Sequence, residues 1–140
     1  MLGTKPSLRT CNKPSRPQIS RMSIFKPNPS DIVTKAFVEH CCEAYQMDHN
    51  GYHGFDHWMR VLYNGRLLAG MENANIRVVE LFCLLHDTQR RNEYRDPSHG
   101  RRAARYARSL RGTWFDISDE EMNLLTEHSN TTQMATQRAI

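Results

Sequence analysis

The sequence predicts an all-α fold, because apolar residues recur at three- and four-residue steps along most of the chain and no segment alternates between apolar and polar residues. Ser118 and Glu121 add a capping box, a pattern that marks the start of a helix. A chain of 140 residues with 39% hydrophobic content suffices for one domain but is too short for two ordinary ones. We therefore expect a single bundle of about five helices.

Residues 1–30 differ in composition from the rest of the chain. They contain all but one of the six prolines, six Lys or Arg and no acidic residue. A segment with so few apolar residues cannot bury enough surface to offset the entropy lost on ordering. We expect a disordered basic tail at 1–30 and a helical domain at 31–140, with a mitochondrial transit peptide as an alternative interpretation of the tail.

The helical domain begins where the tail ends. Asp31 is the expected cap of the first helix, whose apolar pattern is broken by Gly51 and Gly54. The later helices are expected in this order: 55–69, 74–86, 99–111, and a last one that Ser118 and Glu121 open. The fourth helix has a narrow apolar stripe formed by Ala103, Ala104, Ala107 and Leu110. Arg101, Arg105 and Arg108 lie on one face of this helix, and we interpret them as a solvated surface and not as a nucleic-acid-binding stripe.

The charge distribution argues against a nucleic-acid-binding domain. The whole chain carries +4, but the tail holds six of the 19 basic residues and none of the 15 acidic ones, so residues 31–140 carry −2. No run approaches the roughly 18 apolar residues that a membrane span needs. Four cysteines, with Cys41 and Cys42 adjacent, give no disulfide framework. We expect a cytoplasmic protein, or a mitochondrial one if the tail is a targeting segment, without membrane or nucleic-acid partners.

Two potential metal ligands end the third predicted helix, where the apolar run of 78–85 is followed by His86 and Asp87. With a helix turn near 70–72, His57 on the second helix is as many residues from the turn as His86 is. At about 1.5 Å per residue each lies about 20 Å from the turn of an antiparallel hairpin, so the two imidazoles reach the same height. We expect them to share one ion with Asp87.

Imidazole and carboxylate ligands suit Mn, Mg, Co, Ni, Zn or Fe better than a metal that prefers thiolates. Such an ion lowers the pKa of a bound water and neutralises charge at phosphorus, which favours hydrolysis of a phosphate ester. An isolated His-Asp pair, however, is more often a helix cap or a core histidine. The motifs around the pair therefore decide whether it is interpreted as a metal site.

Three motifs accompany the pair in order: "HGFDHWMRVLYNGRLLAG" at 53–70, "VVELFCLLHDTQRRN" at 78–92 and "DPSHGRRAA" at 96–104. Over about residues 50–130 this arrangement resembles the HD-domain superfamily of metal-dependent phosphohydrolases, in particular its small single-domain members. The resemblance implies an HD-domain-like helical bundle. It also implies a divalent metal cofactor and a small phosphorylated substrate, such as a nucleotide.

The resemblance further implies roles for particular residues. His57 and His86 would be metal ligands, and Asp87 would be a ligand that also orients the nucleophilic water, which makes His86 and Asp87 the catalytic residues. Arg90, Asn92, Asp96 and His99 match the polar segment that follows the pair in this group, although Asp96 with Pro97 also suits a turn. The implied substrate contacts are His53, Arg90, His99, Arg102 and His128.

The chain departs from the family pattern in one respect. HD-domain enzymes normally complete the metal site with an aspartate from a helix beyond the region of His128, and residues 129–140 contain no aspartate. We therefore interpret the domain as C-terminally truncated relative to the family. Either three ligands hold the metal with extra waters, or metal binding is weak; apolar surface left uncovered would favour a homo-oligomer.

Three functions follow from these observations. The first is a metal-dependent phosphohydrolase that acts on a nucleotide or another small phosphate ester through a metal-bound water. The alternative is a truncated or degenerate HD-domain protein that binds metal weakly and has a non-catalytic binding role. A third interpretation, an iron-dependent oxygenase with two His ligands and one carboxylate, has less support.

Overall fold

The structure, a computed structural model, describes residues 28–138, with side chains as far as residue 129. Within this part the all-α prediction is confirmed, with no strand and five helices: α1 (Lys35–Ala44), α2 (Phe55–Glu72), α3 (Ile76–Leu85), α4 (His99–Leu110) and α5 (Asp119–Arg138). The tail predicted at 1–30 lies outside the described residues except for its last three positions. None of the described helices is both long and apolar enough to cross a bilayer.

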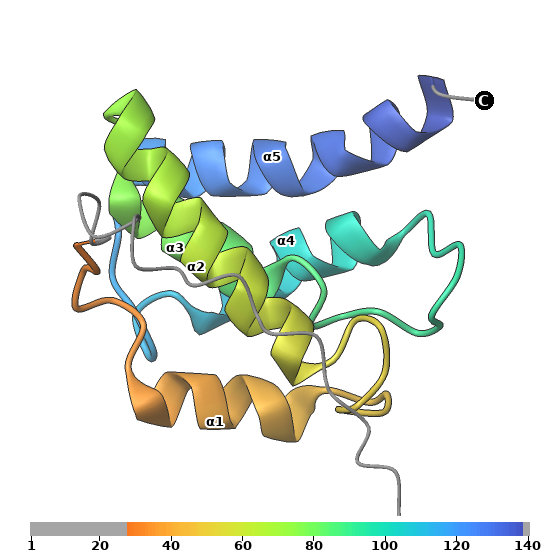
Figure 1. Ribbon diagram of the computed structural model, residues 1–140. Helices are drawn as coiled ribbons and strands as arrows, with labels where there is room; N and C mark the ends of the chain where they lie inside the picture. Colours follow the sequence, from red (N-terminus) through yellow and green to blue (C-terminus); the bar gives the residue numbers. More distant parts are fainter. Residues whose placement is uncertain (1–27, 139–140) are drawn as a thin grey trace, which may run out of the picture.

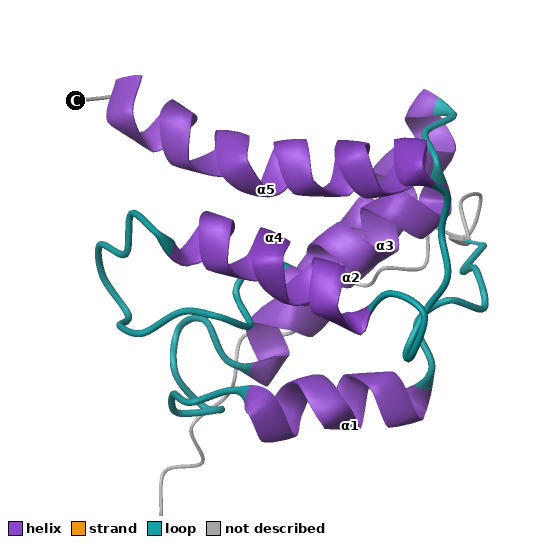
Figure 2. Cartoon of the chain, turned by 180° about the vertical axis from the view of Figure 1, so that it is seen from behind, coloured by secondary structure: helices purple, strands orange, loops and turns teal. Residues whose placement is uncertain are grey.

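The helices form a crossed arrangement around one core. Figure 1 shows α5, α4 and α1 one below another, with α2 and α3 running diagonally across them. The view from behind in Figure 2 places α4 between α5 and α1. The described helices make their main contacts in three pairs, α2 with α3, α4 with α5, and α3 with α5. Helix α3 therefore packs against both its hairpin partner and the last helix.

The hairpin turn lies farther along the chain than predicted. Helix α2 continues to Glu72 and ends at Asn73, which adopts the left-handed conformation (φ 51°, ψ 39°). Asn75 then caps α3 by accepting hydrogen bonds from the N–H groups of Arg77 and Val78. The turn predicted at 70–72 was wrong, because Gly70 is tolerated inside the helix while Asn73 supplies the conformation that ends it.

Of the predicted starts of α5 and α1, the first is confirmed and the second was wrong. The capping box is confirmed: Ser118 N–H donates to Glu121 Oε2 (2.9 Å), and Glu121 N–H donates to Ser118 Oγ (3.2 Å). Asp31, by contrast, does not cap α1. Thr34 Oγ1 accepts the N–H of Phe37 instead (3.2 Å). Ile32 is buried in the core, so the segment before α1 already packs against the core.

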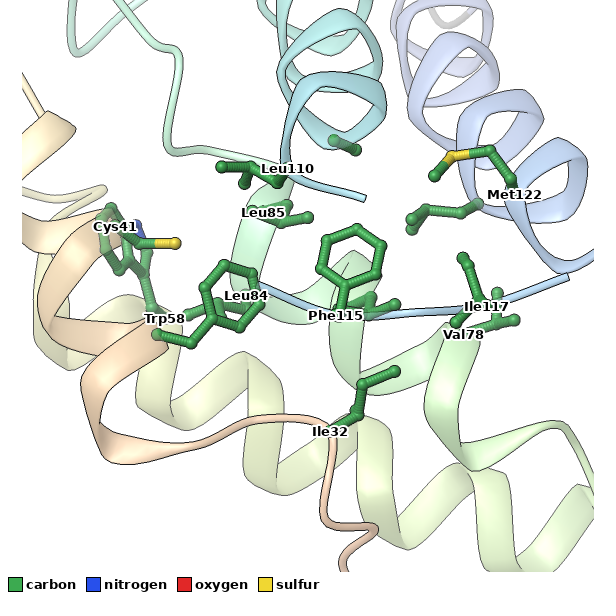
Figure 3. Packing of buried hydrophobic residues seen from close by; sticks show 14 of the residues in the cluster. Ile32, Cys41, Trp58, Val78, Leu84, Leu85, Leu110, Phe115, Ile117 and Met122 are labelled. Carbon is green, nitrogen blue, oxygen red and sulfur yellow. The ribbon is translucent and has the colours of Figure 1, made fainter. Parts of the chain in front are cut away.

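Packing of the core fixes the helix ends that carry the candidate site. Trp58 and Leu85 are fully or almost fully buried, and they directly adjoin His57 and His86 in the sequence. Figure 3 shows Trp58 and Leu84 among the apolar side chains that meet between the helices. A Cβ at Gly65 would overlap Cys83 Sγ, so glycine there permits the close approach of α2 and α3.

A buried ion pair that the sequence analysis missed also joins α2 to α3. Glu80 is fully buried, and its Oε1 lies 2.6 Å from Arg66 Nε. The same carboxylate accepts the N–H of Ser30 (3.2 Å) and also its hydroxyl. A buried carboxylate requires such partners, because an isolated charge in the core would be very costly. The pair therefore holds the segment before α1 against the hairpin.

Replacing Arg66 by Ala should leave the buried Glu80 charge without its cationic partner. We expect the free energy of unfolding in urea to fall by on the order of 3 kcal/mol. The control is Arg60→Ala, which removes an exposed arginine from the same helix. This variant should change the free energy of unfolding by less than about 0.5 kcal/mol. Equal losses in the two variants would contradict a stabilising role for the ion pair.

Candidate metal centre

The candidate centre lies where one end of the α2–α3 hairpin meets the start of α4. His57 is in the first turn of α2, His86 caps the end of α3, and Asp87 follows immediately. His53 lies in the loop before α2, and His99 is the first residue of α4. The antiparallel course of the hairpin brings the start of one helix to the end of the other, so residues distant in sequence converge.

Three imidazoles surround one oxygen of Asp87. Its Oδ2 lies 2.9 Å from His53 Nδ1, 3.1 Å from His57 Nε2 and 3.2 Å from His86 Nε2. Asp87 is itself only 2% exposed. The structure thus brings together the three residues that the sequence analysis named as ligands, and adds His53 to them.

The other oxygen of Asp87 has different neighbours. Oδ1 lies 2.8 Å from Arg90 Nε and 3.7 Å from His99 Nε2. Burial alone would raise the pKa of Asp87, but hydrogen bonds and charges from His86 and Arg90 outweigh burial and hold this pKa well below its usual range. Asp87 is therefore ionised at neutral pH, with Oδ1 directed to Arg90 and Oδ2 directed to the three imidazoles.

Backbone hydrogen bonds select the tautomers of two of these histidines. His86 Nδ1 lies 2.9 Å from the carbonyl oxygen of Cys83, and His99 Nδ1 lies 2.5 Å from that of Asp96. A carbonyl can only accept, so each Nδ1 carries a hydrogen, and each Nε2 either donates a hydrogen bond when the ring is protonated or offers a lone pair when the ring is neutral. Both Nε2 atoms face Asp87. This is the arrangement that proteins use to orient a metal-binding histidine.

His57 also offers a lone pair at neutral pH. Burial lowers the pKa of its imidazole below the ordinary value, although the nearby Asp87 charge acts in the opposite direction. A neutral imidazole nitrogen that faces a carboxylate is repelled by it unless a proton or a cation lies between them. The site therefore has the electrostatic character of a cation-binding site.

A group of three residues could hold a metal ion in the part of the chain that the structure describes. Donor atoms of His53, His57 and Asp87 all lie within 4.8 Å of one another. Two metal ligands at about 2.1 Å and at right angles are about 3.0 Å apart, close to the 2.9–3.2 Å observed between Asp87 Oδ2 and the three histidines. His53 was expected to contact the substrate, so its place in this group was not predicted.

The backbone of His53 is held on both sides. Its N–H donates to Glu93 Oε2 (3.2 Å), and its carbonyl accepts from the hydroxyl of Tyr45 (3.0 Å). A Cβ at Gly51 would overlap Glu93 Oε1, so glycine there lets the two loops approach. Neither Tyr45 nor Glu93 was recognised from the sequence, since nothing in their spacing relates them to His53.

Two of the expected substrate contacts lie apart from Asp87. Arg102 donates from Nη2 to the carboxylate of Asp96 and from Nε to the carbonyl of Gln89 (3.0 Å). The Asp96 carboxylate therefore directs Arg102 to a hollow along α4 that is separate from the candidate centre. His128 lines an apolar groove, with Nδ1 2.8 Å from the carbonyl oxygen of Leu124. As substrate contacts both residues remain predictions.

Binding of a divalent metal should stabilise the folded protein. We expect Mn²⁺ or Ni²⁺ at 100 times its Kd to add about 2.7 kcal/mol to the free energy of unfolding, and EDTA to reverse the effect. Thermal unfolding measures both changes. His57→Ala should lose most of this stabilisation, whereas His49→Ala, which removes an exposed histidine from the preceding loop, should keep it. A metal response that is unchanged in His57→Ala would refute the centre.

Glu93 should act on metal affinity through the position of His53. We expect Glu93→Ala to weaken metal binding about 10- to 100-fold, the usual effect of losing a residue that orients a ligand. Glu93→Gln keeps an oxygen that can accept the His53 N–H and should retain more of the affinity. Titration calorimetry measures both variants, and equal affinity in Glu93→Ala and the unmodified protein would exclude this role.

Comparison with known proteins adds no further assignment. No protein-family model matches the chain, and neither a curated protein nor a solved structure is similar enough to count as a match. Membership of the HD-domain superfamily therefore stays a prediction from the three sequence motifs, and the function has to be argued from the residues around Asp87.

Proposed function

We propose that this protein binds a divalent metal ion at the centre formed by His53, His57, His86 and Asp87 and hydrolyses a phosphate ester there, as the resemblance to the HD-domain superfamily implies. One observation carries the proposal: imidazole nitrogens from two segments of the chain meet the same oxygen of a buried, ionised carboxylate. Such convergence requires a proton or a cation between the nitrogens and the carboxylate, and it is expected in a metal site.

The residues fit a divalent ion of intermediate softness. Imidazole nitrogens and one carboxylate oxygen are donors that suit Mn, Fe, Co, Ni and Zn. When bound, the ion would lower the pKa of a water molecule and neutralise charge on a phosphoryl oxygen. The chain itself supplies the orientation: the carbonyl of Cys83 aims His86 Nε2, and Arg90 fixes Asp87 through Oδ1, which leaves Oδ2 available.

The charge of the centre favours an anionic substrate. Asp87 and Arg90 cancel each other's charge, and an imidazole that binds a metal ion is neutral, so a divalent ion would leave the centre at about +2. A phosphate monoester dianion would neutralise this charge, whereas a neutral ester or amide would leave it uncompensated in a partly buried site. We therefore favour a nucleotide or another small phosphate ester as the substrate.

A non-catalytic metal-binding role is the second candidate, and the same charge count supports it. Asp87 is the one carboxylate in the metal group found among residues 28–129. Its charge is also shared with Arg90. A ligand set without net negative charge binds a divalent ion more weakly than one with two free carboxylates. Turnover by the metal-loaded protein separates the two roles.

Phosphate release should depend on the centre. With Mn²⁺ supplied, we expect hydrolysis of a nucleoside monophosphate or p-nitrophenyl phosphate, and Asp87→Ala should lower kcat/KM at least about 100-fold because the main charged ligand is lost. His49→Ala is again the matched control and should retain activity. Release of inorganic phosphate provides the measurement. If the metal-loaded protein releases no phosphate from any of a nucleotide panel, the non-catalytic role is the better description.

A further inference from the structure

An open hollow runs along α4 and shares none of the residues of the metal centre. Its volume is about 360 Å³, and it is lined by Gln89, Arg91, Arg102, Arg105, Tyr106 and Ser109. Figure 2 shows the loop that follows α3 returning toward the start of α4. The hollow is therefore formed by a face of α4 on one side and the beginning of that loop on the other.

The charge of the hollow is strongly positive. Three of its six lining residues are arginines and none is acidic. Arg102 is neutralised by Asp96, but neither Arg91 nor Arg105 makes an ion pair within the part of the chain that the structure describes. Arg91 and Arg105, both exposed, thus border the same concave surface without a carboxylate partner among the described residues.

One buried carboxylate fixes the two walls of the hollow relative to each other. Asp96 is 8% exposed, and its Oδ2 accepts both the backbone N–H of Arg91 (2.8 Å) and Nη2 of Arg102. The carbonyl of Gln89 holds Arg102 Nε as well (3.0 Å). Arg102 is therefore oriented before any ligand arrives, which reduces the entropy lost on binding.

We propose that this hollow binds a small anion carrying two or more phosphate groups, separately from the metal centre. Guanidinium groups bind phosphate oxygens through paired hydrogen bonds, and Arg91 and Arg105, whose charges no carboxylate of the described residues neutralises, are together suited to two phosphate groups. The proposal goes beyond the proposed hydrolase function, because it needs neither a metal ion nor a reaction.

A long polyanion fits the surface less well than a small one. Nucleic acid would require a basic stripe that continues beyond the hollow. Arg108, the next arginine along α4, is instead engaged with the last helix, where its Nη2 donates to Thr126 Oγ1 (2.9 Å). The row of arginines that lines the hollow therefore ends at Arg105, which favours a compact ligand.

Titration calorimetry with inorganic tripolyphosphate, in EDTA and at 150 mM salt, tests the proposal. We expect one ion to bind per chain. Arg91→Gln and Arg105→Gln should each weaken binding about 10-fold or more, the change expected from losing a charged hydrogen bond worth about 1.4 kcal/mol. The matched control is Arg101→Gln, which removes the same charge from α4 at an exposed residue outside the hollow and should bind nearly as well as the unmodified protein.

Four results would overturn the proposal. They are no binding by the unmodified protein, equal weakening by Arg101→Gln, loss of binding in His57→Ala, or tighter Arg91-dependent binding of an oligonucleotide. The second result would mean diffuse attraction to a basic helix, and the third would place the anion at the metal centre. Backbone amide shifts of the unmodified protein should change around 89–91 and 102–109 on titration, which locates the ion without relying on a variant.

Discussion

The buried charge of Asp87 is the constraint around which this end of the molecule is organised. An ionised carboxylate that is only 2% exposed must be surrounded by donors or cations, because the loss of hydration would otherwise outweigh the packing gained. Its neighbours come from the loop before α2, from α2 itself, from the end of α3 and from the start of α4. The hairpin, the following loop and α4 must therefore all be in place before this carboxylate is satisfied.

Spacing along helices predicted the pair His57 and His86 well, although one step of the argument was wrong. The turn lies at 73–75 and not at 70–72, so the two histidines are not equally far from it. They nevertheless approach, with ring centroids 5.6 Å apart. Periodicity thus identifies which helix ends meet, but it does not fix the register.

Loops and buried polar groups were the parts that spacing could not predict. His53 reaches Asp87 only because Glu93 and Tyr45 fix the path of the backbone before α2, and this path has no period. Glu80 stands at a position of α3 that the apolar pattern would assign to an ordinary core residue. Its role emerges only when Arg66 and Ser30 are placed beside it. The motifs therefore identified three of the residues that meet at Asp87 and did not identify the supports of a fourth.

The segment that follows α3 contains two buried acids whose surroundings lead to opposite binding preferences. Asp87 presents Oδ2 to imidazoles whose own hydrogens are partly committed to backbone carbonyls, so the space between them attracts a cation. Asp96 is satisfied by Arg102 and by the N–H of Arg91, which leaves the charges of Arg91 and Arg105 uncompensated nearby. Burial of a carboxylate alone therefore does not decide what a site binds. The groups around the carboxylate determine which ligand is preferred. Lone pairs that converge favour a metal ion, and guanidinium groups without a carboxylate partner favour a phosphate-bearing anion.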